Sequence, residues 1–166
     1  YETAGLLYQK YLEFFTNSTH APTIQFYLAE IQFKQERFIP AADNYYAVYK
    51  TPSAGNLRVD AIHYALMALD KEMNAQRKKD GLSEISKTNT AKINETETDS
   101  NPTPLNPVES KFVIVGNDYA SKFPKAKDTS DVLYQIAYLK YSHFRFPEAY
   151  QTFWGIVQKY PGNPTS

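Results

Sequence analysis

The chain has 166 residues, a length that suits one domain or one stretch of a helical array. Its 18 basic residues balance its 18 acidic residues, which argues against a protein that binds the phosphate backbone of nucleic acids. The sequence contains no cysteine, so disulfides and thiolate metal sites are excluded. Because no apolar run approaches the ~18 residues of a membrane-spanning helix, we expect no direct membrane insertion in this segment.

Apolar residues spaced by three and four predict two helices at the start of the chain. The first covers 2–15, and a Thr-Asn-Ser triplet at 16–18 interrupts it. The second begins near Pro22, where a missing N–H costs nothing in a first helical turn, and runs to about Gln35. This second helix is apolar nearly all round, which indicates contacts on two sides.

Two more helices are predicted before a change in composition. Residues 38–50 form the third helix, and Pro52 and Gly55 follow its end. The fourth begins near Asn56, a plausible N-cap, and extends to about Lys79 through a polar segment.

Residues 81–106 are rich in Thr, Asn, Ser, Glu and Pro and contain no aromatic residue. Such a segment cannot bury enough surface to offset the entropy lost on ordering, so we expect a flexible polar insertion. It is either a spacer or a partner-binding segment that orders on contact.

Three further helices are predicted after the insertion. They cover 107–123, which Pro124 ends, then 129–143 and 147–160. Asp128 and Asp131 lie where carboxylates cap a helix and favour its macrodipole, so we interpret them as caps of the second of these helices.

The apolar skeleton of residues 11–49 recurs 108 positions later without a gap. Self-similarity of this kind is typical of stacked-helix arrays, which are usually binding surfaces rather than catalysts. The matching pairs are Tyr11/Tyr119, Phe15/Phe123, Ile24/Val132, Phe26/Tyr134, Leu28/Ile136, Ala29/Ala137, Ile31/Leu139, Phe33/Tyr141, Phe38/Phe146, Ala41/Ala149, Tyr45/Phe153 and Val48/Ile156.

The helix pairs resemble tetratricopeptide repeats (TPR). The small residues expected where two helices touch are Ala29, Ala65, Ala137, Ala41 and Ala149. The resemblance implies an all-α fold, a right-handed α-solenoid of antiparallel helix pairs with about three and a half repeats. These are a half repeat (2–15), a full repeat (22–50), a repeat split by the insertion (57–79 with 107–123) and a full repeat (129–160). Residues 1–80 and 107–166 then flank the insertion within one domain, which we expect to be a fragment of a longer protein.

The chain departs from the family pattern at two kinds of position. Gln32, Ala68 and Lys140 stand where the family often has an aromatic residue. The glycine of the turn between the paired helices is replaced by Glu36 and Phe144.

The amino-acid sequences of the repeats are similar to those of repeats in some bacterial envelope proteins. The stretch YLEFFTNSTHAPTIQFYLAEIQFKQERFIPAADNYY resembles repeats of outer-membrane assembly lipoproteins and of Tol-Pal cell-division coordinator proteins. This resemblance implies a scaffold in the periplasm or associated with the outer membrane.

In such arrays the first helix of each pair lines a concave face that binds a protein or peptide. Apolar anchors with a few charges suit a peptide groove, although half of these residues could instead pack against the next helix. Carried over by the resemblance, the candidate partner-binding residues are Phe26, Glu30, Phe33, Lys34, Ile62, Leu66, Leu69, Tyr134, Tyr138 and Tyr141.

We expect no catalytic residue, no cofactor and no metal in this segment. His20, His63 and His143 lack partners at the spacing of a zinc site or a catalytic triad. Two alternatives stay open beside a binding scaffold. The segment could be the non-catalytic helical superstructure of a larger enzyme, such as a peptidoglycan-cleaving enzyme, or it could mediate self-association.

Overall fold

The computed structural model describes residues 2–81 and 101–162. Within these ranges the chain forms seven α-helices, one short 3-10 helix and no strand, so the fold is all-α as predicted. The chain divides into two compact units, Tyr1–Ala75 and Gln76–Ser166.

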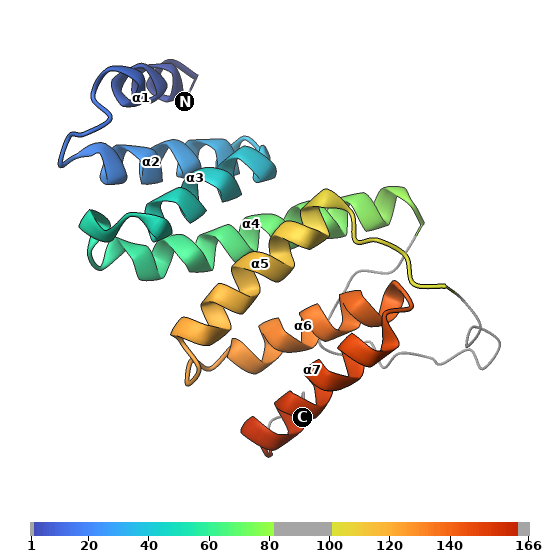
Figure 1. Cartoon of the computed structure of the whole chain (residues 1–166). Helices are drawn as coiled ribbons and strands as arrows, with labels where there is room; N and C mark the ends of the chain where they lie inside the picture. The colour runs from blue at the N-terminus through green and yellow to red at the C-terminus, as the bar shows by residue number, and fades with distance from the viewer. Residues whose placement is uncertain (1, 82–100, 163–166) are drawn as a thin grey trace. The chain divides into compact units, whose positions relative to one another are not determined.

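The first unit contains three consecutive antiparallel helices and most of a fourth (Figure 1). Helix α1 (Glu2–Phe14) packs on α2 (Ala21–Lys34), which packs on α3 (Phe38–Lys50). The short helix η1 (Pro52–Ala54) then leads into α4 (Leu57–Lys79), whose residues up to Ala75 belong to this unit.

Small residues and aromatic rings build the core of the first unit. Ala29 of α2 and Ala41 of α3 are fully buried, which lets the two helices approach closely. The ring of Phe26 meets Tyr45 edge-on at 5.1 Å, and Tyr64 of α4 stacks on Tyr45 at 5.5 Å. Aromatic contacts of this kind therefore join α2, α3 and α4.

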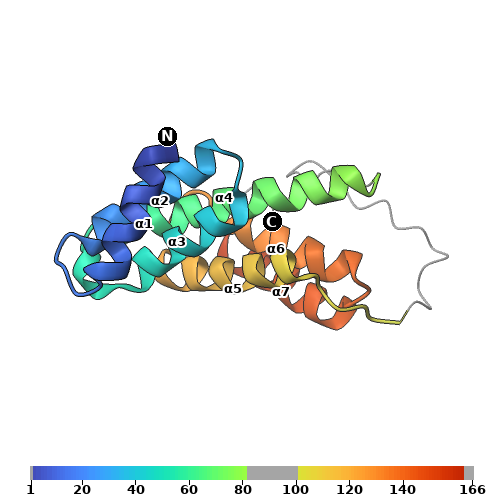
Figure 2. The same ribbon diagram turned by 90° about the horizontal axis from the view of Figure 1, so that it is seen from above.

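The second unit contains three helices that again lie next to one another (Figure 2). These are α5 (Pro107–Lys122), α6 (Thr129–Ser142) and α7 (Phe146–Lys159). Gly116 brings α5 close to α6, because a Cβ atom built there would lie 3.0 Å from Val132 Cγ1 and 2.8 Å from Ile136 Cδ1.

The internal repeat of the sequence is reproduced in the local structure. Phe33 contacts Phe38 at 5.4 Å, and their counterparts Tyr141 and Phe146 contact each other at 5.4 Å. A polar pair recurs as well, because Asn44 donates to Gln32 at 2.8 Å and Lys140 donates to Thr152 at 3.3 Å. The partners of the second pair lie 108 positions after those of the first.

The turns between the paired helices have the same backbone bonds. The amides of Glu36 and Arg37 donate to Phe33 and Gln32, and those of Phe144 and Arg145 donate to Tyr141 and Lys140. Glu36 (φ 58°) and Phe144 (φ 57°) both adopt the left-handed conformation that favours glycine. The two residues that replace the expected turn glycine thus keep its conformation.

The predicted helix positions agree with the structure to within about two residues at each end. One interpretation is confirmed only in part: Asp128 occupies the N-cap position of α6 and Asp131 lies in its first turn, but the Asp128 side chain makes no capping hydrogen bond. It accepts a hydrogen bond of 2.6 Å from the hydroxyl of Tyr119 instead, so it joins α5 to the start of α6.

Most of the predicted insertion lies outside the described residues, at 82–100. Residues 101–106 are described, and Thr103 is fixed to His143 by a backbone bond of 2.9 Å and a side-chain bond of 2.9 Å. The assignment of all the helices to one domain stays a prediction. Among the described helices, none has the length and apolar character needed to cross a lipid bilayer.

Candidate functional site

The predicted partner-binding residues of α2 differ in exposure. Phe26 is buried and contacts Tyr45 and Tyr64, so its ring belongs to the packing of the unit. Phe33 and Glu30 are half-buried, and Lys34 is exposed. Of the predicted α2 residues, Glu30, Phe33 and Lys34 therefore keep surface that can meet a partner.

The predicted residues of α4 are all buried. Ile62 and Leu69 have no exposed surface, and Leu66 is nearly as covered. In this structure they contribute apolar burial rather than surface for a partner, which corresponds to the packing alternative.

The predicted residues of α6 are half-buried. Tyr134 meets Phe153 of α7 edge-on at 5.5 Å, and Tyr141 lies 5.4 Å from Phe146. Tyr138 lies between them along the helix and is half-buried as well. Each of these tyrosines keeps part of its surface in contact with solvent, so the α6 set remains available to a partner.

Burial and a nearby charge both change the pKa of Tyr45, which lies on α3 and contacts Phe26 of α2. Burial raises the pKa of its hydroxyl above the ordinary range, and the carboxylate of Glu30 raises it further. The Tyr45 side chain therefore stays neutral at physiological pH.

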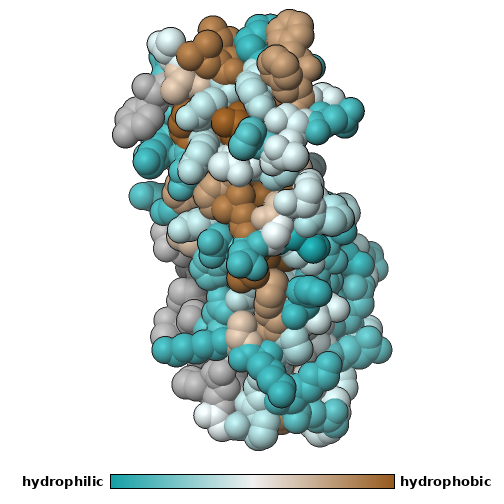
Figure 3. All heavy atoms as spheres, turned by 90° about the vertical axis from the view of Figure 1, so that its left-hand side faces the viewer, coloured by the Kyte–Doolittle hydropathy of each residue, from teal (hydrophilic) through white to brown (hydrophobic). Residues whose placement is uncertain are grey.

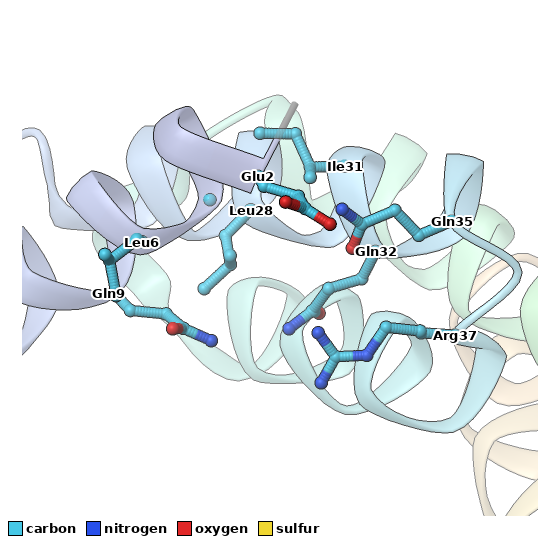
Figure 4. A pocket seen from close by; sticks show the side chains of 9 residues that line it. Glu2, Leu6, Gln9, Leu28, Ile31, Gln32, Gln35 and Arg37 are labelled. Atoms are coloured by element: carbon cyan, nitrogen blue, oxygen red, sulfur yellow. The ribbon is translucent and has the colours of Figure 1, made fainter.

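A pocket of about 430 Å³ lies between α1, α2 and the start of α3 (Figure 4). Its volume falls within the range of small-ligand pockets. Leu28 and Ile31 supply apolar surface, and the amide of Gln32 lies next to the guanidinium of Arg37. The other residues that line it are Glu2, Gly5, Leu6, Gln9 and Gln35.

These lining residues offer a carboxylate, a guanidinium and three amides, but no hydroxyl, thiol or imidazole. The set can hold polar groups, and it lacks a nucleophile with an adjacent base. None of the ten predicted residues lines this pocket. The sequence feature that could have indicated this pocket is Gln32, a polar residue inside an apolar run. Gln32 is buried and accepts a hydrogen bond from Asn44.

One imidazole is built into the second unit. His143 lies 2.9 Å from the buried carboxylate of Glu109, and its other ring nitrogen lies 2.9 Å from the hydroxyl of Thr103. His20 and His63 are exposed. Among the described residues no group of three or more His, Asp or Glu side chains could hold a metal ion.

Large exposed apolar side chains occur on several helices, and the two most exposed among the described residues, Phe14 and Tyr150, lie on α1 and α7. Figure 3 shows brown atoms at the top of that view, where α1 lies. The exposed apolar residues of α1 are Leu6, Leu7 and Phe14, and Phe15 follows the helix. On α7 the exposed residues Tyr150, Trp154 and Val157 follow a spacing of four and three, a helical pattern visible in the sequence that is not among the predicted partner-binding residues.

Comparisons of this chain with protein-family models, with curated proteins and with solved structures find no match.

Proposed function

We propose that this chain is a TPR-like α-solenoid of about three and a half repeats that binds a protein or peptide partner. The observation that carries the proposal is the recurrence of one helix pair, α2–α3 and α6–α7, with equal turn bonds and equal ring contacts 108 residues apart. Repeated helix pairs bury their apolar faces on each other and leave one face for a partner.

The surface proposed to bind a partner is smaller than the sequence predicts. The first unit contributes Glu30, Phe33 and Lys34 on α2, and the second unit separately contributes Tyr134, Tyr138 and Tyr141 on α6, because Phe26 and the three α4 residues are buried. Half-buried aromatic side chains anchor a partner well, since they are already fixed by packing and lose little entropy on binding. The charges of Glu30 and Lys34 would fix the register of the partner.

The repeat style supports placing this scaffold in a bacterial envelope complex, in the periplasm or at the outer membrane. This location is part of the proposal, and the same experiment can test it.

The test is site-specific photo-crosslinking in cells of the source organism. The photoreactive amino acid p-benzoylphenylalanine replaces Lys34 in one variant and Tyr138 in another. A matched control places it at Ile114, an exposed apolar residue on α5 outside the proposed surface. We expect positions 34 and 138 to give an adduct with the same partner in the envelope fraction, and position 114 to give none.

Failure of both positions to form an adduct would overturn the proposed binding surface. An equal adduct from position 114 would do the same, because it would mean contact without regard to face. An adduct found only in the cytoplasmic fraction would overturn the envelope location and leave the binding function standing.

A further inference from the structure

The outer side of α7 presents an apolar face that the partner-binding surface above does not include. Tyr150, Trp154 and Val157 lie on one side of the helix and are 66%, 51% and 46% exposed. The rings of Tyr150 and Trp154 stack at 6.3 Å with an interplanar angle of 10°. Aromatic and aliphatic side chains gathered in one exposed patch are typical of an interaction site.

The internal repeat shows what covers this face elsewhere in the same chain. The residues of α3 that lie 108 positions before Tyr150 and Val157 are Ala42 and Tyr49, which are 1% and 8% exposed, whereas Tyr46, the counterpart of Trp154, is half-buried. In the first unit two residues of α4, Arg58 and Tyr64, contact this side of α3 at Tyr49 and Tyr45. Arg58 of α4 donates from Nε to the carbonyl oxygen of Tyr49 at 2.6 Å, and its guanidinium lies 5.4 Å over the Tyr49 ring.

Besides Arg58, a second residue of α4 contacts α3, and its side chain is aromatic. Tyr64, six residues after Arg58, stacks on Tyr45 at 5.5 Å and meets Phe26 edge-on at 5.9 Å. The counterparts of Tyr45 and Phe26 in the second unit are Phe153 and Tyr134, which make the same edge-on contact with each other. The second unit therefore has the same pair of aromatic rings, Phe153 on α7 and Tyr134 on α6, that Tyr64 of α4 contacts in the first unit.

We propose that the outer face of α7 docks an amphipathic helix of another polypeptide that carries an arginine in its first turn and an aromatic residue about six positions later. The carbonyl groups of the last turn of α7 carry partial negative charge, which attracts such an arginine as the Tyr49 carbonyl attracts Arg58. The aromatic residue then packs against Phe153 in the way that Tyr64 packs against Tyr45.

One position differs between the two faces and makes the proposal specific. Tyr150 places a ring where α3 has the methyl group of Ala42. A helix that fits α7 must therefore offer a small residue opposite Tyr150, and α4 itself fits α7 less closely than it fits α3. Replacing Tyr150 with alanine makes the α7 face more like the α3 face.

The experiment uses Trp154, the single tryptophan of the chain, as a reporter at the centre of the face. A synthetic peptide with the sequence of residues 56–79, which contains no tryptophan, is titrated into the whole 166-residue chain. We expect a saturable blue shift of Trp154 emission as the peptide excludes water. The Tyr150→Ala chain should bind the peptide at least about threefold more tightly, and a peptide with Arg58→Ala and Tyr64→Ala should produce no shift.

A matched control chain carries Ile114→Ala, which removes an exposed apolar side chain from α5, and it should titrate like the unchanged protein. Circular dichroism checks that each variant remains helical.

The absence of a shift with both the unchanged and the Tyr150→Ala chains would overturn the proposal. An equal shift with the doubly substituted peptide would overturn it too, as would loss of the shift in the Ile114→Ala chain. A blue shift that grows with protein concentration alone, with a dimer in sedimentation, would mean that a second copy covers this face and would equally overturn it.

Discussion

Glu109 and His143 join the start of α5 to the end of α6 through a contact of 2.9 Å between Oε2 and Nε2. The Glu109 side chain is only 6% exposed, and its carboxylate also accepts a bond of 2.9 Å from the amide of Asn106. The other ring nitrogen of His143 lies 2.9 Å from Thr103 Oγ1. One imidazole therefore connects the segment before α5, the first turn of α5 and the turn between α6 and α7.

We predict that His143→Ala lowers the free energy of unfolding by about 1–3 kcal/mol, because it leaves the buried Glu109 carboxylate without a main partner. Urea denaturation followed by circular dichroism measures the change. His20→Ala is the matched control, since His20 is exposed and makes no side-chain capping bond, and it should change stability by less than about 0.5 kcal/mol. A double variant with Glu109→Gln that shows simple additivity would contradict the coupling.

Two glycines within helices of the second unit give opposite predictions. At Gly116 an added methyl group would press on Val132 and Ile136, and Ile136 is fully buried and has little room to move. At Gly155 of α7 a Cβ atom would meet nothing within 4 Å.

We expect Gly116→Ala to destabilise the protein by about 1 kcal/mol, because overpacking outweighs the gain in helix propensity. Gly155→Ala should stabilise it by about 0.5–1 kcal/mol, because only the propensity gain remains. Thermal unfolding of the two variants side by side measures the difference. Equal shifts of the melting temperature would show that α5 and α6 do not approach as closely as Gly116 indicates.

Glycine should suit position 36, in the turn between α2 and α3, better than the present glutamate does. Its φ of 58° costs an L-residue about 1 kcal/mol, and glycine avoids this cost while losing more entropy on folding. We therefore expect Glu36→Gly to raise the free energy of unfolding by about 0.5 kcal/mol, measured by urea denaturation. Glu36→Ala keeps the strain and serves as the control, so a gain from alanine as large as the gain from glycine would contradict the explanation.

The apolar spacing and the internal repeat were sufficient to predict the all-α fold and the positions of its helices. Ala29 and Ala41 illustrate why: small residues at fixed places in each pair mark where two helices cross, and both are fully buried here. These features are local, because they depend on neighbours three or four residues apart and on one short turn.

The candidate site was harder to predict because it depends on which sides of a helix are covered. Phe26 and Ile62 have the position of partner-binding residues in the repeat pattern, yet both are buried. Asp128 has the position of a cap, yet it accepts from Tyr119 on another helix. Such choices between a local and a tertiary partner are decided by packing that spacing alone does not describe.

Tyr45 should make stability depend on alkaline pH. Folding raises the pKa of its hydroxyl, chiefly through burial and further through Glu30, so the folded state keeps this proton after the unfolded chain has lost it. The contribution of the protonated Tyr45 hydroxyl to the free energy of unfolding is therefore complete below the ordinary tyrosine pKa of about 10. It is lost as the pH rises above this value. We expect the free energy of unfolding to fall above about pH 10, with Tyr45 contributing up to about 1.4 kcal/mol per pH unit. Urea denaturation between pH 8 and about 11 compares the chain with Tyr45→Phe, which keeps the ring and should show a smaller fall. Identical curves for the two proteins would contradict the role of this hydroxyl.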